Sequence, residues 1–200
     1  VLEQATRQTE GLQIELTMPT DSADVVLRLY DGSLWVLGPG AAIVMDGPQK
    51  TPSIAVTNVE ALADMVETHL KPLAKVLNLL RLSTQLGEAS STLRLDTKLQ
   101  RKTQDAENFE EIQSKPGVLP TLNDQDELRV TFTNESETPL DVTVLFIDSH
   151  YGVTVVYPRG EGQSNRLLPG SFGTTGGLIN VDTVGQERML FIATRTEAGV

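Results

Sequence analysis

Short stretches of alternating hydrophobic and polar residues occupy the first part of the chain and predict β-strands. A period of two places every second side chain on one face, which is typical of a half-buried strand. Asp31-Gly32 joins two of these stretches and predicts a tight hairpin, because both turn residues must adopt positive φ. We expect four short strands here, at residues 12–17, 24–30, 33–37 and 41–46.

The hydrophobic period lengthens to three and four residues from Val59 onward, which predicts a long amphipathic helix. Pro72 lies inside this pattern and cannot donate a helical hydrogen bond, so we expect a kink or break between His69 and Lys71. The apolar residues of the helix stripe are Leu62, Ala63, Val66, Leu70, Leu73, Val76, Leu77 and Leu80.

Strand-like alternation returns after the helix. Residues 92–100 predict one strand, whereas residues 101–126 are mostly polar and predict a loop. The glycine-rich stretch GSFGTTGG (170–177) has neither a lysine nor a following helix, so we expect a surface loop and not a phosphate-binding loop. Further strands are expected at residues 127–133, 140–148, 153–157 and 188–194.

These patterns together predict an α+β fold. We expect a mainly antiparallel, sandwich-like β part at the C-terminus, a smaller N-terminal β part, and one long helix interrupted by proline between them. The expected domains are residues 1–103, with the N-terminal hairpins, the helix and a connector strand, a linker loop at 104–126, and a C-terminal β-sandwich domain at 127–200.

Charge and composition narrow the choice of partners and compartment. The formal net charge of −11 disfavours binding to nucleic acid or to an anionic membrane surface, and no apolar run is long enough to span a membrane. The first ten residues, VLEQATRQTE, do not predict a signal peptide and resemble a cut from a longer parent protein. We expect a cytoplasmic protein.

The chain contains few of the residue types that commonly act as catalytic nucleophiles or metal ligands. The absence of cysteine excludes disulfides, thiolate zinc sites and a cysteine nucleophile within these residues. His150 lies between two predicted strands in LFIDSHYGVTVVYP, and we expect a solvent-facing turn there. His69 is about eighty positions away, too isolated to form a zinc site with it. We therefore expect no catalytic residue, no metal site and no cofactor in this chain.

Two weaker candidates for ligand binding remain. Asp124, Asp126 and Glu127 form an acidic cluster that could contact Ca²⁺, although it lacks the glycine and closing glutamate of an EF-hand loop, which favours a solvated strand entry. Trp35 is the only tryptophan, and we expect a buried anchor in preference to a ligand-stacking side chain.

A longer pattern covers residues 128–194. Its successive parts are LRVTFTN, a turn ending in Pro139-Leu140, VTVLFID, a turn ending in Gly152, VTVVYP, Asn165, LLPG, Gly185-Gln186-Glu187 and MLFIAT. In this order they resemble a domain of unknown function that follows the catalytic domain of bacterial caspase-like peptidases, the family of caspases and metacaspases, and that is also attached to some bacterial kinases. The segment ALADMVETHLKPLAKVLNLLRLS before TLRLDTKL is similar to the connector in those proteins.

The resemblance implies a non-catalytic accessory domain that regulates proteolysis by binding a substrate, a partner or the peptidase itself. Although VLFIDSHYG imitates the caspase histidine motif, it corresponds to a hairpin of the appended domain, so no catalytic residue is carried over. The alternative is a β module that binds a glycan or Ca²⁺ and has no link to proteolysis.

Two sets of residues follow from this hypothesis. An edge strand or the loop at 159–177 would contact the partner, and the residues expected at the interaction surface are Arg166, Leu167, Leu168, Pro169, Gly170 and Trp35. The resemblance also implies cleavage after basic residues, which makes Lys98, Arg101 and Lys102 a candidate processing site. An ordinary solvated loop is the favoured alternative for these three residues.

Overall fold

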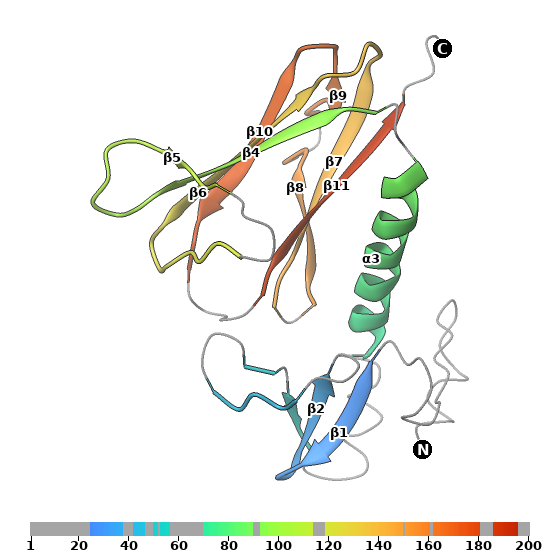
Figure 1. Cartoon of the computed structure of the whole chain (residues 1–200), viewed down its shortest axis with the longest axis vertical. Coiled ribbons are helices and arrows are strands. Elements are labelled where there is room, and N and C mark those ends of the chain that lie inside the picture. The colour runs from blue at the N-terminus through green and yellow to red at the C-terminus, as the bar shows by residue number, and fades with distance from the viewer. Residues whose placement is uncertain are drawn as a thin grey trace. The chain divides into compact units, whose positions relative to one another are not determined.

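The computed structural model describes a β-rich α+β chain (Figure 1). The described residues are 25–37, 42–46, 50–51, 53–56, 70–89, 93–113, 119–149, 151–160, 162–180 and 186–195. They divide into two compact units. Unit 1 comprises Val1–Gln85, Ile147–Val153 and Val184–Glu187, and unit 2 comprises Leu86–Phe146, Thr154–Thr183 and Arg188–Val200.

A three-stranded sheet forms the described β part of unit 1. Its order is β1 (Val26–Tyr30), β2 (Ser33–Leu37) and β3 (Ser53–Ala55), all antiparallel. The hairpin predicted at Asp31-Gly32 is confirmed, with φ of 49° and 68° at the two turn residues. These values match a turn whose twist follows that of the strands.

The strand predicted at 41–46 is wrong for its described residues, 42–46. They form a loop in which Val44 and Thr51 exchange two hydrogen bonds, one between backbone atoms at 2.8 Å and one to the threonine hydroxyl at 2.9 Å. The third strand of this sheet is β3 instead. The apolar run at 42–46 was misleading because Val44 and Met45 are exposed and bury no common face.

The helix α3 spans Lys71–Ala89, with Pro72 in its first turn. Leu73 and Val76 are buried, and Leu73 packs with Val36 in the core of unit 1. The strand predicted at 12–17 and the helix predicted over 59–69, with the break expected before Lys71, lie outside the described residues.

Unit 2 contains two sheets. One has the strand order β10-β6-β4-β5 and the other β11-β7-β8, with β9 paired to β7. The strands are β4 (Leu95–Lys102), β5 (Glu110–Glu111), β6 (Glu127–Asn134), β7 (Leu140–Ile147), β8 (Val153–Tyr157), β9 (Arg166–Leu167), β10 (Phe172–Leu178) and β11 (Arg188–Arg195). β4, which the sequence grouped with the N-terminal part, pairs along its whole length with β6.

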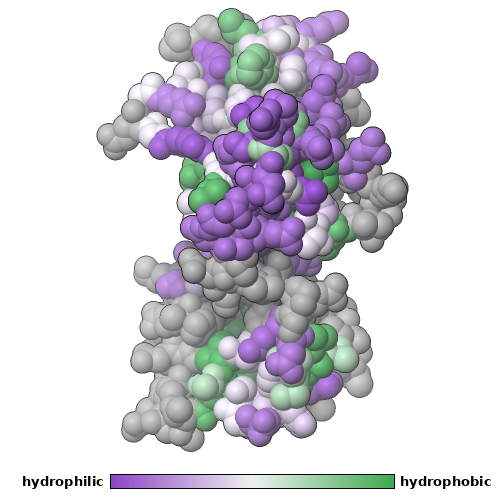
Figure 2. Space-filling view, turned by 90° about the vertical axis from the view of Figure 1, so that its left-hand side faces the viewer, coloured by the Kyte–Doolittle hydropathy of each residue, from purple (hydrophilic) through white to green (hydrophobic). Residues whose placement is uncertain are grey.

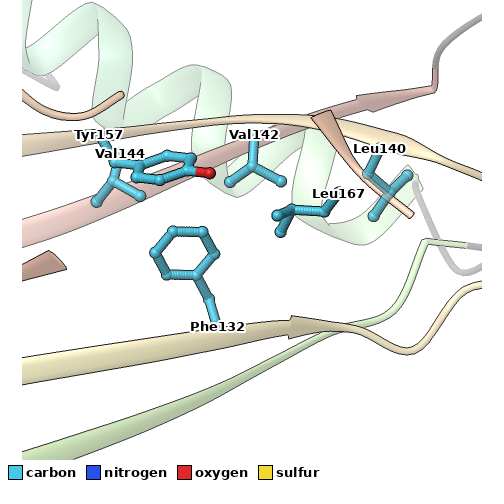
Figure 3. Packing of buried hydrophobic residues seen from close by; sticks show 6 residues of the cluster. All are labelled: Phe132, Leu140, Val142, Val144, Tyr157 and Leu167. Carbon is cyan, nitrogen blue, oxygen red and sulfur yellow. The ribbon is translucent and has the colours of Figure 1, made fainter. Parts of the chain in front are cut away.

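Side chains from both sheets form one hydrophobic core. Phe132 of β6 is fully buried, and its ring meets those of Tyr157 and Phe191 edge-on at centroid distances of 4.8 and 5.7 Å. Figure 3 shows Phe132 pointing toward residues of β7, β8 and β9. The buried members of this cluster are Phe132, Leu140, Val142, Val144, Tyr157 and Leu167.

The surface loop predicted for GSFGTTGG is wrong, because most of this stretch forms the strand β10. β10 pairs with β6 in a continuous antiparallel register from Phe172↔Thr133 to Leu178↔Glu127. A Cβ atom on Gly173 would lie 2.4 Å from the Phe132 ring, so this strand position accepts only glycine without a shift of the core. Glycine is rare in strands, but close packing requires it here.

Candidate interaction surface

No three histidine, cysteine or acidic side chains in the described part of the chain meet in a way that could hold a metal ion. Asp126 is buried, accepts a hydrogen bond from the Asn123 amide at 2.8 Å, and lies 4.0 Å from Arg101. Glu127 is paired with Lys102 at 3.1 Å. Two of the three carboxylates that the weaker alternative assigned to Ca²⁺ therefore already have partners within the chain.

The expected interaction residues have very different exposures. Leu168 is 59% exposed, whereas Leu167 is 4% exposed and lies in the core. Arg166 extends from β9 and forms an ion pair with Asp141 at 3.1 Å. Trp35 is 5% exposed and donates its ring N–H to the Tyr30 carbonyl of β1 at 3.0 Å, so it is an anchor of unit 1. Only part of the expected surface is thus available to a partner.

The candidate processing residues lie in a strand and not in a loop. Lys98, Arg101 and Lys102 belong to β4, which pairs with β6 on one side and, at Gln100 and Arg101, with β5 on the other. Arg101 also borders a hollow of about 350 Å³ and donates to the Thr121 carbonyl at 3.2 Å. A protease would have to unpair this backbone before cutting it. His150 and His69 lie outside the described residues.

Asn134 connects the turn between β6 and β7 to the turn that precedes β10. Its side chain is fully buried, donates to the carbonyl oxygens of Thr138 and Leu167 at 2.9 and 3.0 Å, and accepts from the Ser136 amide at 2.9 Å. The Gly170 amide donates to the Asn134 carbonyl, and the Asn134 amide donates to the Ser171 carbonyl. Gly170 and Ser171 thus lie opposite the single residue Asn134, and Gly170 has a φ of 75°. These two features define a glycine-type β-bulge.

The strand that follows this bulge, β10, lies at an edge of its sheet. β10 is the terminal strand of its sheet, and no described strand pairs with its other edge. Two hydrogen bonds show which residues of β10 bond to β6. The Asn134 amide donates to the Ser171 carbonyl at one end of the paired region, and the Ile179 amide donates to the Asp126 carbonyl at the other. With this pattern, the backbone amide and carbonyl groups that point away from β6 are those of Phe172, Thr174, Gly176 and Leu178.

Apart from the bulge at its start and the Arg159 side chain on Gly176, the edge lacks the features that usually block strand addition. Natural edge strands carry charges, prolines or short lengths, whereas β10 has seven residues and the uncharged sequence FGTTGGL. Phe172, Thr174 and Leu178 are exposed. Hydrophilic side chains predominate on the face of unit 2 in the upper part of Figure 2, and the hydrophobic ones are scattered.

The interior side of β10 is held firmly. The Thr175 hydroxyl is buried and donates to the Val156 carbonyl of β8 at 2.7 Å, which links the two sheets. Arg159, just after β8, donates through its guanidinium to the Gly176 carbonyl, which points away from β6, so this one acceptor of the outer edge is already engaged. The bond from Thr175 thus ties β10 to the opposite sheet, and a strand that is held in place in advance loses less entropy when a partner strand is added.

Comparisons with known proteins add no further constraint. No family model, no curated protein and no solved structure matches the chain. The described part of the chain also holds no helix with the length and apolar character that crossing a membrane requires.

Proposed function

We propose that this chain is a non-catalytic binding module that accepts an extended segment of another protein as an additional strand on β10. The observation that carries this proposal is the open, uncharged edge of a supported seven-residue strand. In strand addition the main chain supplies the affinity, and alternate side chains supply the specificity.

The resemblance in residues 128–194 supports a more specific role. We place the module as an accessory or regulatory domain of a bacterial caspase-like cysteine peptidase in the cytoplasm, where the segment bound on β10 belongs to a substrate, to a partner or to the peptidase. The resembling region includes β6, β7, β8, β10 and β11, so the proposed edge lies inside it. The expected surface around Leu168 and Gly170 adjoins the start of β10.

Thr174 provides a direct test of strand addition. Its N–H faces away from β6, so Thr174→Pro removes an edge donor without deleting a bond of the existing ladder. Thr174→Val is the matched control, because it keeps the amide and the shape of the side chain. Peptides are selected from a library of random dodecapeptides displayed on phage, and their binding to the whole chain is measured by fluorescence anisotropy.

We expect Thr174→Val to bind the selected peptides like the wild type and Thr174→Pro to bind them about tenfold more weakly or worse. Hydrogen exchange read by NMR gives a second measurement that does not depend on the proline variant folding. The Phe172 and Thr174 amides should exchange more slowly when peptide is bound. Failure to select any peptide, or binding that leaves these two amides unchanged, refutes strand addition on β10.

The link to a peptidase has its own test. The parent gene or its neighbour should encode a caspase-like domain with a catalytic cysteine and histidine, and the purified catalytic domain should be retained by this chain in a pull-down. A genomic context without any such domain contradicts the accessory role, while strand addition on β10 would still stand.

A further inference from the structure

The outward-facing groups of β10 are arranged symmetrically about Thr175. Thr174 and Gly176 flank Thr175 directly, and Phe172 and Leu178 lie at equal distances further along the strand. The backbone amides and carbonyls of these four residues point away from β6. A second copy of the same strand, running antiparallel, can therefore lie opposite all of these groups at once.

An antiparallel pairing centred on Thr175 places complementary residues opposite each other. Phe172 of one copy lies opposite Leu178 of the other, and each such pair exchanges two backbone hydrogen bonds. These two side chains are 67% and 57% exposed and lie on the same face of the sheet, so each pair covers apolar surface that is otherwise in water. Thr174 lies opposite Gly176, which has no side chain to crowd it.

The inner face of β10 carries small residues. They are Gly173, Thr175 and Gly177, and the Thr175 hydroxyl is bonded to the Val156 carbonyl of β8. Two such strands can approach to the usual spacing of about 4.8 Å without bulky side chains meeting on this face.

The strand itself is uncharged although the chain is acidic. The chain carries a formal charge of −11, whereas FGTTGGL contains no ionisable side chain. The acidic residue of the neighbouring strand β6 is Glu127, which is paired with Lys102 at 3.1 Å. Three strand spacings separate Glu127 from its counterpart in a second copy. This distance of at least about 14 Å exceeds the Debye length of about 8 Å at physiological salt, so the repulsion between them is screened.

We propose that a second copy of this chain occupies the β10 edge when no partner segment is bound, through antiparallel pairing centred on Thr175. The inference rests on the proposed function, because it uses the same edge, and it names the occupant of that edge in the resting state. The dimer has two-fold symmetry, so the pairing closes on itself and leaves no β10 edge open to a third copy. Closure matters because an uncharged open edge is a site of aggregation.

The pairing is weak enough to be displaced. β10 contributes seven residues from each copy, whereas a stable interface has about 20–30 residues a side. Arg159 weakens it further, because its guanidinium already donates to the Gly176 carbonyl, which is also the acceptor for the Thr174 amide of the second copy. A carbonyl oxygen has two lone pairs and can accept both donors. The two Gly176 positions lie only about 8 Å apart across the pairing, however, so the two guanidinium groups repel each other.

Sedimentation equilibrium of the whole chain tests this inference. We expect a reversible monomer–dimer equilibrium with a Kd on the order of 100 µM, in the range of weak, transient contacts. Phe172→Lys and Leu178→Glu should each raise the Kd about tenfold or more, because a charge then lies against an apolar side chain. The double variant that carries both changes should return to within about threefold of the wild-type Kd, because each introduced ammonium group then lies opposite an introduced carboxylate.

Two further variants accompany this measurement. Leu119→Lys is the matched control and should leave the Kd unchanged, because Leu119 is exposed and its neighbour Pro120 lies beside β5, at the opposite edge of the sheet. Arg159→Ala should lower the Kd about threefold or more, because it frees the Gly176 carbonyl and removes the repulsion between the two guanidinium groups.

A chain that stays monomeric at about 1 mM overturns self-pairing. A dimer that ignores both single variants, or that the double variant does not restore, overturns it as well, and so does a weaker dimer in Arg159→Ala.

The outcomes also separate the two proposals. A phage-selected peptide that protects the edge amides should dissociate the dimer, because both occupy β10. A peptide that binds β10 and leaves the dimer intact shows that the copies associate through another surface, which overturns self-pairing and leaves the proposed function standing. If the dimer responds to the variants as expected but no peptide is selected, self-pairing stands and the binding of a segment of another protein fails.

Discussion

Asn134→Ala should cause a large loss of stability in unit 2, because one buried amide group satisfies three backbone groups. The variant removes two donated bonds and one accepted bond, of 2.9, 3.0 and 2.9 Å. The bonds to Leu167 and Ser136 are fully buried, and a buried group left without a partner costs about 1–3 kcal/mol. We therefore expect a loss of about 2–5 kcal/mol, a large part of a typical stability of about 5–15 kcal/mol.

Urea unfolding followed by far-UV circular dichroism measures this effect. Glu135→Ala is the matched control, because Glu135 is the exposed neighbour and its backbone bond to Arg94 survives the change. Asn134→Asp refines the test, since a carboxylate oxygen would replace the amide nitrogen that faces the carbonyls of Thr138 and Leu167. Its loss of stability should diminish as acid protonates the carboxylate. An Asn134→Ala variant within about 0.5 kcal/mol of Glu135→Ala would refute the reasoning.

Two further predictions concern close packing and pH. Gly173→Ala should lower the free energy of unfolding by about 1–3 kcal/mol in the same assay, because its Cβ would press on the Phe132 ring. Gly177→Ala is the control and should change the stability little, because no atom lies within 4 Å of its Cβ position. Equal losses in the two variants would contradict this reasoning. Burial, and secondarily Asp148, raises the pKa of Glu187 above its ordinary value of 4.5. Its protonated form is favoured in the folded state, so its stabilising contribution is complete below about pH 4.5 and is lost as pH rises through the raised pKa. Glu187→Gln should thus melt higher than wild type at pH 7, with the difference shrinking in acid, and a lower melting temperature at pH 7 would contradict the assignment.

The strands that bury one face were accessible from the sequence. β6, β7, β8 and β11 lie within about two residues of their predicted ranges, because alternation follows directly from burying one face of a pleated strand. The β1–β2 hairpin was equally accessible, because Asp31-Gly32 fixes both its position and its turn. The sequence pattern predicts a strand or turn correctly where neighbouring residues alone determine its structure.

β10 was missed because its determinant is not local. Glycine at three of seven positions argues against a strand, and only the Phe132 ring and the β6 backbone explain why glycine is required there. The two adjacent threonines of FGTTGGL were the available signal, since threonine favours strands. The role of Asn134 was hidden for the same reason, because Asn-Glu-Ser in a turn does not reveal which carbonyls, such as that of Leu167, will surround the amide.

The same glycines connect packing to function. Gly173 and Gly176 are present because a side chain at either position would collide with β6. Their presence removes from β10 the bulky and charged side chains with which edge strands usually prevent pairing. An edge left open only as a by-product of packing would invite aggregation, and the remaining outward positions of such a strand would be expected to carry lysine or glutamate. Phe172, Thr174 and Leu178 occupy those positions instead, which favours an edge that is kept open for a partner strand.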